Sequence, residues 1–462
     1  MSDNTTIAAV ATPVGPGGIA IVRISGPAAE KVAARVFRPA KTGFPLKSHK
    51  LCLGNVVDPK TDRLLDQVLC CFMRAPATYT REDVVEIHSH GGPLAARRVL
   101  DAVLAAGASL AEPGEFTRRA FLAGRIDLSQ AEAVAELIGA RSQVEADLAM
   151  AQLSGGLKEL AETLGKPLIE VLAHLEVALD FPDEEAEIIE GPVAAERLAR
   201  EVLEPLNLLL ADYDSGRVFR EGIKAAIVGQ PNVGKSSLLN ALLQSERAIV
   251  TPQPGTTRDL IEADAVWDGL PLTLVDTAGL ETEAADEAEA QGQARAALRL
   301  ATADLILLVL DRSQPLSNED RRIMTAAPAG RTLLVLNKID LAPAFNPAEV
   351  PDFLGSAPMV EVSALTGQGL ANLREKISQT VTSGAHRPEA VPALVPNLRH
   401  KQALEASRKP LKRAIAGLKN GLAPELTAVE INLTLEELGT ITGQTTPDHI
   451  LDEIFGKFCL GK

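Results

Sequence analysis

Short apolar runs separated by turn-forming residues dominate the first 115 residues. Four of these runs have the length and composition of β-strands: Thr6–Ala11, Ile19–Ile24, Val68–Met73 and Val84–His88. Leu94–Ala105 has helical spacing instead. The mixture predicts an α+β domain over residues 1–118. On the last of these strands, His88 and His90 are expected to face opposite ways, and we expect no metal site there.

A longer-period pattern follows this region. Residues 115–180 and 193–213 are rich in Ala, Leu and Glu at helical spacing, as in Ala131–Ile138 and Leu160–Leu179. The many acidic residues are expected to form a solvated face. We therefore assign residues 119–216 to the first part of a helical domain.

An alternation of apolar strands and helical stretches occupies residues 217–382. The single strand candidates are Ile223–Val228, Asp304–Asp311, Thr332–Leu336 and Met359–Val362. A further pair, Ala263–Trp267 and Leu272–Asp276, is joined by Asp268-Gly269, which favours a hairpin turn. This order of elements is typical of a doubly wound α/β sheet.

A proline-rich linker follows, with Pro388, Pro392 and Pro396. Three helical stretches come after it: His400–Leu418, Ala428–Leu438 and Asp448–Phe455. The return of the helical composition predicts that residues 383–462 form the second part of the helical domain. The predicted fold is therefore multidomain, with an α+β N-terminal domain, a discontinuous α-helical domain and an inserted α/β domain.

Composition narrows the class of protein. A formal charge of −15 and an aromatic content of 3% argue against a general nucleic-acid binder. An RNA partner would have to meet a local basic patch or a second protein. The most basic stretch lies within residues 400–419, where a solvated helix face and an RNA contact remain alternatives.

The sequence also indicates where in the cell the protein is expected. No apolar run approaches the roughly 18 residues that span a bilayer, and the N-terminus has no signal-peptide pattern. We therefore expect a cytoplasmic protein without membrane contact. Its cysteines form no Cys-x-x-Cys pair, and Cys52, Cys70 and Cys71 are expected to be reduced, buried thiols.

The strongest chemical signal is the stretch Gly229-Gln230-Pro231-Asn232-Val233-Gly234-Lys235-Ser236. It lies between the run Ile223–Val228 and the helical stretch Leu238–Leu243, the context in which such a string binds phosphate. Backbone N–H groups and a helix N-terminus can cradle phosphate oxygens. Lys235 is expected to reach the β- and γ-phosphates, and the Ser236 hydroxyl to ligate Mg²⁺.

Two later strand ends carry groups suited to guanine. Asn337-Lys338-Ile339-Asp340 follows one strand run. Its Asp340 carboxylate can accept hydrogen bonds from guanine N1–H and the exocyclic amine, a donor pair that adenine lacks. Ser363-Ala364-Leu365 follows the next run and would supply a backbone N–H for the guanine oxygen.

The remaining motifs concern Mg²⁺ and the γ-phosphate. Asp276-Thr277-Ala278-Gly279 would place Asp276 near Mg²⁺ through water and the Gly279 N–H near the γ-phosphate. Thr257, within Gly255-Thr256-Thr257-Arg258-Asp259, would supply a second Mg²⁺ hydroxyl. The order of all five motifs predicts a GTP-binding domain.

Leu280 stands where small GTPases commonly carry a water-orienting Gln. Leu cannot orient water, so either hydrolysis is slow or another group does this work. The candidates lie in the acidic segment Glu281–Glu289, and the residues alone do not choose among them.

Residues 229–240, 255–259 and 276–280 together resemble the TrmE/Era/Der branch of GTPases. Five further stretches narrow the resemblance to the MnmE (TrmE) family of tRNA-modification GTPases: Thr6–Ala9, Arg23–Pro27, Glu86–Gly92, Pro113–Thr117 and Phe458–Lys462. The resemblance covers essentially the whole chain.

This resemblance implies an N-terminal folate-binding domain that forms a constitutive homodimer, a discontinuous helical domain and an inserted G domain. The family works with an FAD-containing MnmG-type protein. Together they add an aminomethyl or carboxymethylaminomethyl group at the wobble uridine of certain tRNAs, with a one-carbon unit from a tetrahydrofolate derivative. The G domains pair when GTP and K⁺ bind.

The resemblance also assigns catalytic and cation roles. Glu289 matches the water-orienting Glu of the family, with Glu287 as a minor alternative, and acts beside Lys235 and Asn232. Mg²⁺ would be held by Ser236 and Thr257. The K⁺ ligands would be Asn232, Thr251, Gln253 and Thr256. The full set of expected GTP contacts is Asn232, Val233, Gly234, Lys235, Ser236, Ser237, Thr251, Pro252, Gln253, Pro254, Gly255, Thr256, Thr257, Asp276, Thr277, Ala278, Gly279, Asn337, Lys338, Ile339, Asp340, Ser363, Ala364 and Leu365.

The implied folate contacts lie at both ends of the chain: Arg23, Glu86, Arg125 and Lys462. The family often has Lys where Arg125 stands, which keeps the charge but not the geometry. Apolar side chains are expected to anchor the C-terminal tail: Phe455, Phe458 and Leu460. Cys459 matches a family cysteine, for which a packing role is favoured over a chemical one.

The alternative is a ribosome-assembly GTPase switch, as in the Era and Der relatives. Era-like chains end in a small RNA-binding domain, and Der-like chains carry two G domains. This chain has one phosphate-loop motif and the folate-type N-terminal stretches. The tRNA-modification function is therefore favoured.

Overall fold

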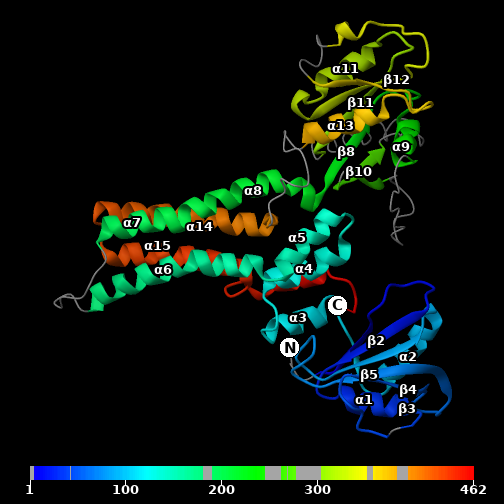
Figure 1. Cartoon of the computed structure of the whole chain (residues 1–462), viewed down its shortest axis with the longest axis vertical. Helices are drawn as coiled ribbons and strands as arrows, with labels where there is room; N and C mark the ends of the chain where they lie inside the picture. Colours follow the sequence, from blue (N-terminus) through cyan, green and yellow to red (C-terminus); the bar gives the residue numbers. More distant parts are fainter. Residues whose placement is uncertain are drawn as a thin grey trace, which may run out of the picture. The chain divides into compact units, whose positions relative to one another are not determined.

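The computed structural model describes residues 5–41, 43–180, 190–244, 262–267, 269–276, 303–350, 357–381 and 394–461. The chain divides into two compact units (Figure 1). Unit 1 comprises Met1–Ile138, Gln152–Val202 and Ala406–Lys462, and unit 2 comprises Gly139–Ala151 and Leu203–Glu405. The multidomain fold expected from the sequence is confirmed. The exact domain limits stay a prediction.

Unit 1 begins with a seven-stranded sheet of order β3-β4-β5-β6-β2-β1-β7. Neighbouring strands are antiparallel except the β1–β7 pair. The strands are β1 (Ile7–Val10), β2 (Ile19–Ser25), β3 (Phe37–Pro39), β4 (Lys50–Val57), β5 (Leu64–Met73), β6 (Val84–His90) and β7 (Ser109–Leu110). Two helices, α1 (Ala29–Val36) and α2 (Pro93–Ala105), contribute to the same core. The α+β expectation and its four strands are confirmed.

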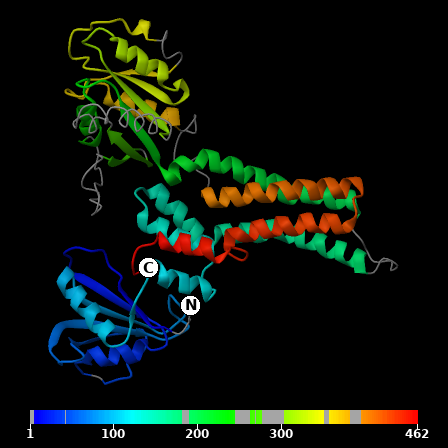
Figure 2. The same ribbon diagram turned by 180° about the vertical axis from the view of Figure 1, so that it is seen from behind.

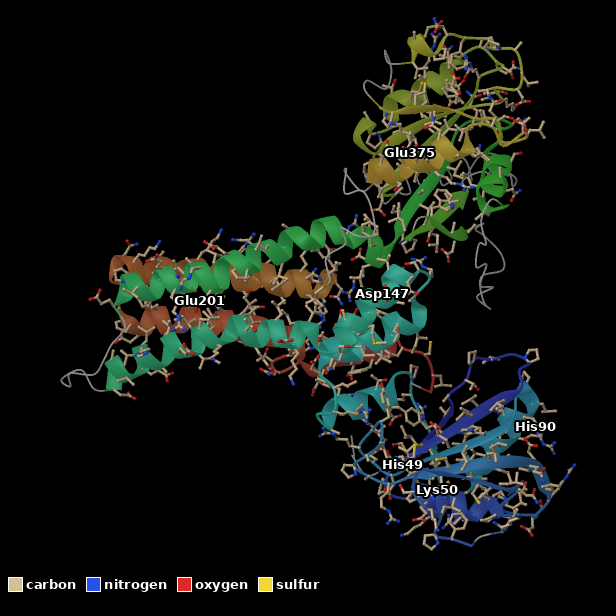
Figure 3. All side chains as sticks on the ribbon, viewed as in Figure 1. His49, Lys50, His90, Asp147, Glu201 and Glu375 are labelled. Carbon is tan, nitrogen blue, oxygen red and sulfur yellow. The ribbon has the colours of Figure 1, made fainter. Side chains whose placement is uncertain are left out.

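The period-two pattern of these strands decides which side chains enter the core. Along β6, Val85 and Ile87 are buried, whereas Glu86 and His88 are half-buried on the other face. The expectation that His88 and His90 face opposite ways is therefore wrong, because residues two apart on a strand share a face. The exposed His90 (Figure 3) bonds through Nδ1 to Asp66 of β5 at 2.7 Å.

Helices form the rest of unit 1. They include α3 (Glu115–Leu122), α4 (Leu128–Gly139), α6 (Gly156–Asp180), α7 (Gly191–Leu198), α15 (Pro424–Thr442) and α16 (Asp448–Gly456). The helices α6 and α15 come from distant parts of the sequence and lie side by side (Figures 1 and 2). This pairing is the physical basis of the discontinuous helical domain, because each half supplies an apolar face to the other.

Unit 2 contains a six-stranded sheet of order β13-β12-β11-β8-β10-β9. Its strands are β8 (Ile223–Val228), β9 (Glu262–Trp267), β10 (Leu270–Asp276), β11 (Leu305–Asp311), β12 (Thr332–Asn337) and β13 (Met359–Glu361). All pairs are parallel except the β9–β10 hairpin, as the sequence predicted. The helices include α9 (Lys235–Gln244), α11 (Asn318–Ala326) and α13 (Leu370–Val381). The central strand β11 is continuously apolar because both of its faces are buried.

Three further helices belong wholly or partly to unit 2: α5 (Gln143–Leu153), α8 (Glu204–Glu221) and α14 (Leu398–Asn420). Leu148 of α5 joins the core of the parallel sheet. Among the described helices, none combines the length and the hydropathy needed to cross a membrane. Pro388 and Pro392 of the predicted linker lie outside the described residues.

The four cysteines all lie within the described residues and form no disulfide. Only Cys70 is fully buried, and burial raises its pKa to about 12. Cys52 and Cys71 are half-buried, so the expectation of buried thiols holds for one of the three.

Candidate functional site

The glycine-rich stretch forms the turn between β8 and α9 in unit 2. Gly229 and Gly234 both have positive φ, 154° and 97°. A Cβ at Gly229 would collide with the Val309 carbonyl, and one at Gly234 would collide with the Asn337 side chain. Glycine is therefore required at both positions, because the loop passes this close to the ends of β11 and β12.

Lys235 begins α9 and turns back over the loop. Its Nζ donates hydrogen bonds to the carbonyls of Gly229, at 2.6 Å, and Gln230, at 2.9 Å. The residue is 4% exposed. A buried ammonium is stable only when it is paired or hydrogen-bonded, and these carbonyls meet that need.

Asn337, at the end of β12, and Lys338, just after it, bind to the same loop. Asn337 Nδ2 donates to the Val233 carbonyl at 2.9 Å, and its Oδ1 accepts from the Ala364 N–H at 3.0 Å. Lys338 Nζ donates to the Asn232 carbonyl at 2.8 Å. The structure thus brings together the loop, a strand end that follows it by 104 residues, and the Ala364 turn 27 residues further on.

Asp340 and Ser363 are also neighbours. Ser363 Oγ donates to Asp340 Oδ1 at 2.6 Å and accepts from the Thr366 N–H at 3.1 Å. This bond orients an otherwise exposed carboxylate. Leu365, 85% exposed, follows on the same turn.

Asp311 was not among the residues expected at this site. It ends β11 and is the register partner of Asn337 on β12. Its Oδ2 lies 2.6 Å from Lys338 Nζ. Burial disfavours the ionised carboxylate, but hydrogen bonds from Lys338 and Ser313 outweigh it, so the pKa of Asp311 lies below its ordinary value. Its position at the carboxyl end of an apolar strand was the signal available in the sequence.

A cavity of about 440 Å³ adjoins the loop. It is lined by residues of the loop, of the β11–α11 connection and of the strand end after β12: Gln230, Pro231, Asn232, Val233, Leu310, Asp311, Gln314, Pro315, Leu316, Ser317, Asp320 and Lys338. Ligand-sized space therefore lies next to the predicted phosphate site.

Several predicted site residues fall outside the described residues: Thr251, Pro252, Gln253, Pro254, Gly255, Thr256, Thr257, Thr277, Ala278, Gly279, Glu287, Glu289 and Lys462. Asp276 is the last residue of β10, and Ser236 and Ser237 lie in the first turn of α9. Within the described ranges no group of three His, Cys, Asp or Glu side chains could hold a metal. The Mg²⁺ and K⁺ assignments therefore stay predictions.

A second candidate cluster lies on the N-terminal sheet in unit 1. Arg23 of β2 and Glu86 of β6 are register partners. Both Nε and Nη2 of Arg23 lie 2.9 Å from Glu86 Oε1. The two side chains are 18% and 19% exposed. The other carboxylate oxygen, Oε2, faces His88 Nε2 at 3.5 Å. His88 was missed as a neighbour of Glu86, although the i, i+2 spacing predicts it.

The C-terminal tail reaches this cluster. Arg23 Nη1 donates to the Gly461 carbonyl at 3.5 Å. Gly461 has φ 90°, and a Cβ there would collide with the Val10 carbonyl of β1. The last described residue of the chain is thus packed directly against the N-terminal sheet.

Aromatic packing holds the tail. Phe455 contacts Phe121 and Phe458, with ring centroids 6.0 Å and 5.4 Å apart. Phe455 and Phe458 are buried with Leu128 in one small core. Leu460 is 48% exposed, so the expectation that it anchors the tail is wrong. Cys459 is exposed, so its burial does not support the packing role that was favoured for it.

Arg125 stands beside this cluster rather than in contact with Glu86. It donates to the Thr78 carbonyl, and its guanidinium lies 5.5 Å from the ring centroid of Tyr79. Tyr79 packs against the small core that contains Phe116, and the Phe116 ring lies 5.8 Å from the Arg23 guanidinium. Burial raises the pKa of Tyr79. Sequence reasoning missed Tyr79, which has no distinguishing local pattern.

The basic stretch of α14 is only partly a free surface. His400 is buried, and Lys401 Nζ lies 4.6 Å from the Tyr213 ring centroid. Arg413 pairs with Glu430 of α15 at 2.7 Å. Lys409, Lys412 and Lys419 are exposed. The two interpretations of this stretch both stay open.

Comparison with known proteins covers both units. A family model described as the MnmE helical domain matches residues 128–459, and one described as the GTP-binding protein TrmE N-terminus matches residues 6–125. A tRNA modification GTPase MnmE of Geobacter sulfurreducens is 47% identical over 461 residues, covering 99% of each chain. One of the same name from Moorella thermoacetica is 47% identical over 467 residues, covering 99% of this chain and 100% of that protein.

Proposed function

The chain belongs to the MnmE family of tRNA modification GTPases, and on that premise we propose that it is a K⁺-activated GTPase that acts with folate and an MnmG-type FAD protein. As a family member it hydrolyses GTP in tRNA modification. The proposal adds the finer chemistry: an aminomethyl or carboxymethylaminomethyl group is placed at the wobble uridine, with a one-carbon unit from a tetrahydrofolate derivative.

One observation gives the main support for the proposed GTP site. The glycine loop, the strand end at Asn337-Lys338 and the turn at Ser363-Ala364 form one hydrogen-bonded assembly. In this assembly, Asp340 would accept the two donors of the guanine edge. Lys235, already turned toward the loop, would exchange carbonyl oxygens for phosphate oxygens. Strand ends at one edge of a parallel sheet are where such folds bind ligands.

The chain's own groups fit the two cations. Asn232 and Ser236 are exposed at the loop and at the start of α9, and both offer the oxygen ligands that hard cations prefer. Mg²⁺ would be held by Ser236 and Thr257, and K⁺ by Asn232, Thr251, Gln253 and Thr256. When bound, the cations supply positive charge beside the phosphates. Glu289 would orient the attacking water.

The folate site is proposed at the Arg23–Glu86 cluster. The amino-pyrimidinone edge of a pterin suits a carboxylate such as Glu86, and Arg23, Arg125 and Lys462 suit anionic or carbonyl oxygens. One polar atom supports the fit: the buried His88 Nε2 lies 3.5 Å from Glu86 Oε2 but makes no hydrogen bond within the described residues.

A homodimer through the N-terminal domain is part of the proposal. Leu51 and Leu53 of β4 are 57% and 50% exposed. Leu53 is the register partner of Leu69, which in turn pairs with His88, so this apolar strip shares a face with the folate cluster. Exposed apolar strips of this kind mark interaction surfaces.

The decisive experiment compares two outcomes in a strain that lacks the gene. We expect tRNA nucleoside analysis to show loss of the wobble-uridine modification, restored by the intact chain. Changed ribosome sedimentation with unchanged tRNA would favour the assembly switch instead. In vitro, hydrolysis should be fast in K⁺ and much slower in Na⁺, and Asn232→Ala should blunt this difference. Equal rates in both salts would exclude the K⁺ role.

A further inference from the structure

We propose that Asp311 is a positioning residue that holds Lys338 on the phosphate loop and so sets both the guanine-nucleotide affinity and the conformation of Asn232. Affinity for GDP and GTP follows from the GTPase activity of the family. The link to K⁺ rests on the proposed cation role of Asn232.

The geometry begins with two adjacent parallel strands. Asp311 and Asn337 are register partners at the carboxyl ends of β11 and β12. Lys338, the next residue, has a left-handed backbone, φ 65°. A non-glycine residue adopts this conformation only when its surroundings compensate for the strain. The bonds of the Lys338 side chain to Asp311 and to the loop provide that compensation.

The lysine ammonium joins two groups at once. Its Nζ lies 2.6 Å from Asp311 Oδ2 and 2.8 Å from the Asn232 carbonyl oxygen. An ammonium has three donors, so both bonds form together. Asp311 thus fixes the side chain that would flank the guanine base.

Asp311 is itself held in place. Its Oδ1 accepts from the Ser313 N–H at 2.9 Å and from Ser313 Oγ at 2.6 Å, which leaves Oδ2 for the lysine. The carboxylate is only 11% exposed. Each oxygen therefore has its own partner, and the carboxylate cannot turn away from Lys338 without losing hydrogen bonds.

The effect reaches Asn232 through its backbone. Asn232 also has a left-handed φ of 65°, and Lys338 holds its carbonyl. A second tether acts two residues earlier, where Gln230 Nε2 donates to Ser317 Oγ at the start of α11. The connection from Asp311 to Ser317 therefore holds the loop at two points. Loss of the Asp311 tether should free the Asn232 end alone.

Asp311→Asn removes the charge with little change in shape. We expect GDP and GTP to bind about tenfold more weakly, within the range of coupling between neighbouring charged groups. The measurement is fluorescence titration of the full-length protein with a fluorescent GDP analogue and competition by GTP. The K⁺ concentration that gives half-maximal hydrolysis should rise as well.

The matched control is Asp304→Asn. Asp304 pairs with Arg217 at 2.9 Å just before the opposite end of β11, so the change is chemically the same. We expect unchanged GDP affinity in this variant. An equal loss in both variants would mean a general effect on the sheet and would overturn the proposal.

A double-mutant cycle separates positioning from structure. If Asp311 acts through Lys338, Asp311→Asn should add no further loss of GDP affinity in a Lys338→Met background. Additive losses, or unchanged affinity in Asp311→Asn alone, would refute the positioning role. Should Asp311→Asn fail to fold, Ser313→Ala tests the same support, with a smaller loss expected.

The proposed effect of Asp311 on nucleotide affinity and its proposed effect on K⁺ activation can be refuted independently. A wild-type protein indifferent to K⁺ would remove the proposed cation function, while the GDP titrations would still decide the role of Asp311. Weakened GDP binding with an unchanged K⁺ requirement would exclude the Asn232 link and retain the nucleotide role.

Discussion

The glycine loop in unit 2 and the Arg23–Glu86 cluster in unit 1 are built in opposite ways. The loop is held because its own backbone carbonyls accept hydrogen bonds from the side chains of Lys235, Asn337 and Lys338, the last two at the carboxyl end of a parallel strand. The cluster consists of side chains in the middle of antiparallel strands, completed by the far end of the chain. The first site requires particular backbone conformations, and the second requires that distant segments meet.

This difference explains which signals each site leaves in the sequence. A backbone cradle needs glycines and a lysine at fixed spacing, so it produces a motif. A side-chain cluster on a sheet face needs only one residue from each strand, so Arg23 and Glu86 stand 63 residues apart without a local pattern. Only the resemblance to a family pointed to them.

The largest effect is expected from deleting the C-terminal tail, which should affect the Arg23–Glu86 cluster and leave the GTP site unchanged. Deleting Phe458–Lys462 should abolish tRNA modification while GTP affinity and K⁺-stimulated hydrolysis stay largely intact, because the described tail contacts, of Phe458 and Gly461, are with residues of unit 1. Nucleoside analysis and steady-state hydrolysis give the two readouts. Leu460→Ala is the control, since this exposed side chain should be dispensable. Parallel loss of both activities would contradict the separation.

The next effect lies in the G domain alone. Glu289→Ala should lower single-turnover hydrolysis by about 10²–10⁴-fold, the usual cost of losing a group that handles water or protons. GTP and Mg²⁺ should still bind. Glu287→Ala is the comparison variant. If hydrolysis survives the first change and fails in the second, the assignment across this segment is off by two residues.

The third-largest effect is expected on recognition of the guanine base. Asp340→Asn would present a donor to a guanine donor and leave polar groups unpaired, costing about 2–4 kcal/mol of GTP affinity. The variant should prefer xanthosine triphosphate, whose edge complements the amide. Competition titrations with both nucleotides test this. Unchanged GTP affinity would remove the guanine assignment from Asp340.

The smallest effect tests the sheet-face cluster. Glu86→Ala should weaken binding of 5-formyltetrahydrofolate by at least about tenfold, or 1.4 kcal/mol. GDP affinity should not change. Calorimetry gives the folate affinity, with Asp62→Ala as a matched control on the same domain, because the Asp62 side chain is 76% exposed. Equal folate binding in wild type and Glu86→Ala would refute this site.

Much of the fold was predictable because periodicity is local. The continuous apolar run of β11 and the β9–β10 hairpin follow from residues that are neighbours in sequence. Strand β4 was not predicted. Its half-buried Cys52 lies between the exposed Leu51 and Leu53, and the buried Gly54 follows, so its pattern is not a clean alternation of apolar and polar residues.

For the GTP site, the sequence alone determined the loop, its glycines and its lysine, because phosphate binding requires these residues at fixed spacing. Only the tertiary structure decided that Asp311 meets Lys338 and that Gly461 meets Arg23, 438 residues away. Strand register and tail docking set these contacts. Both depend on the packing of the whole core, which no single stretch of sequence contains.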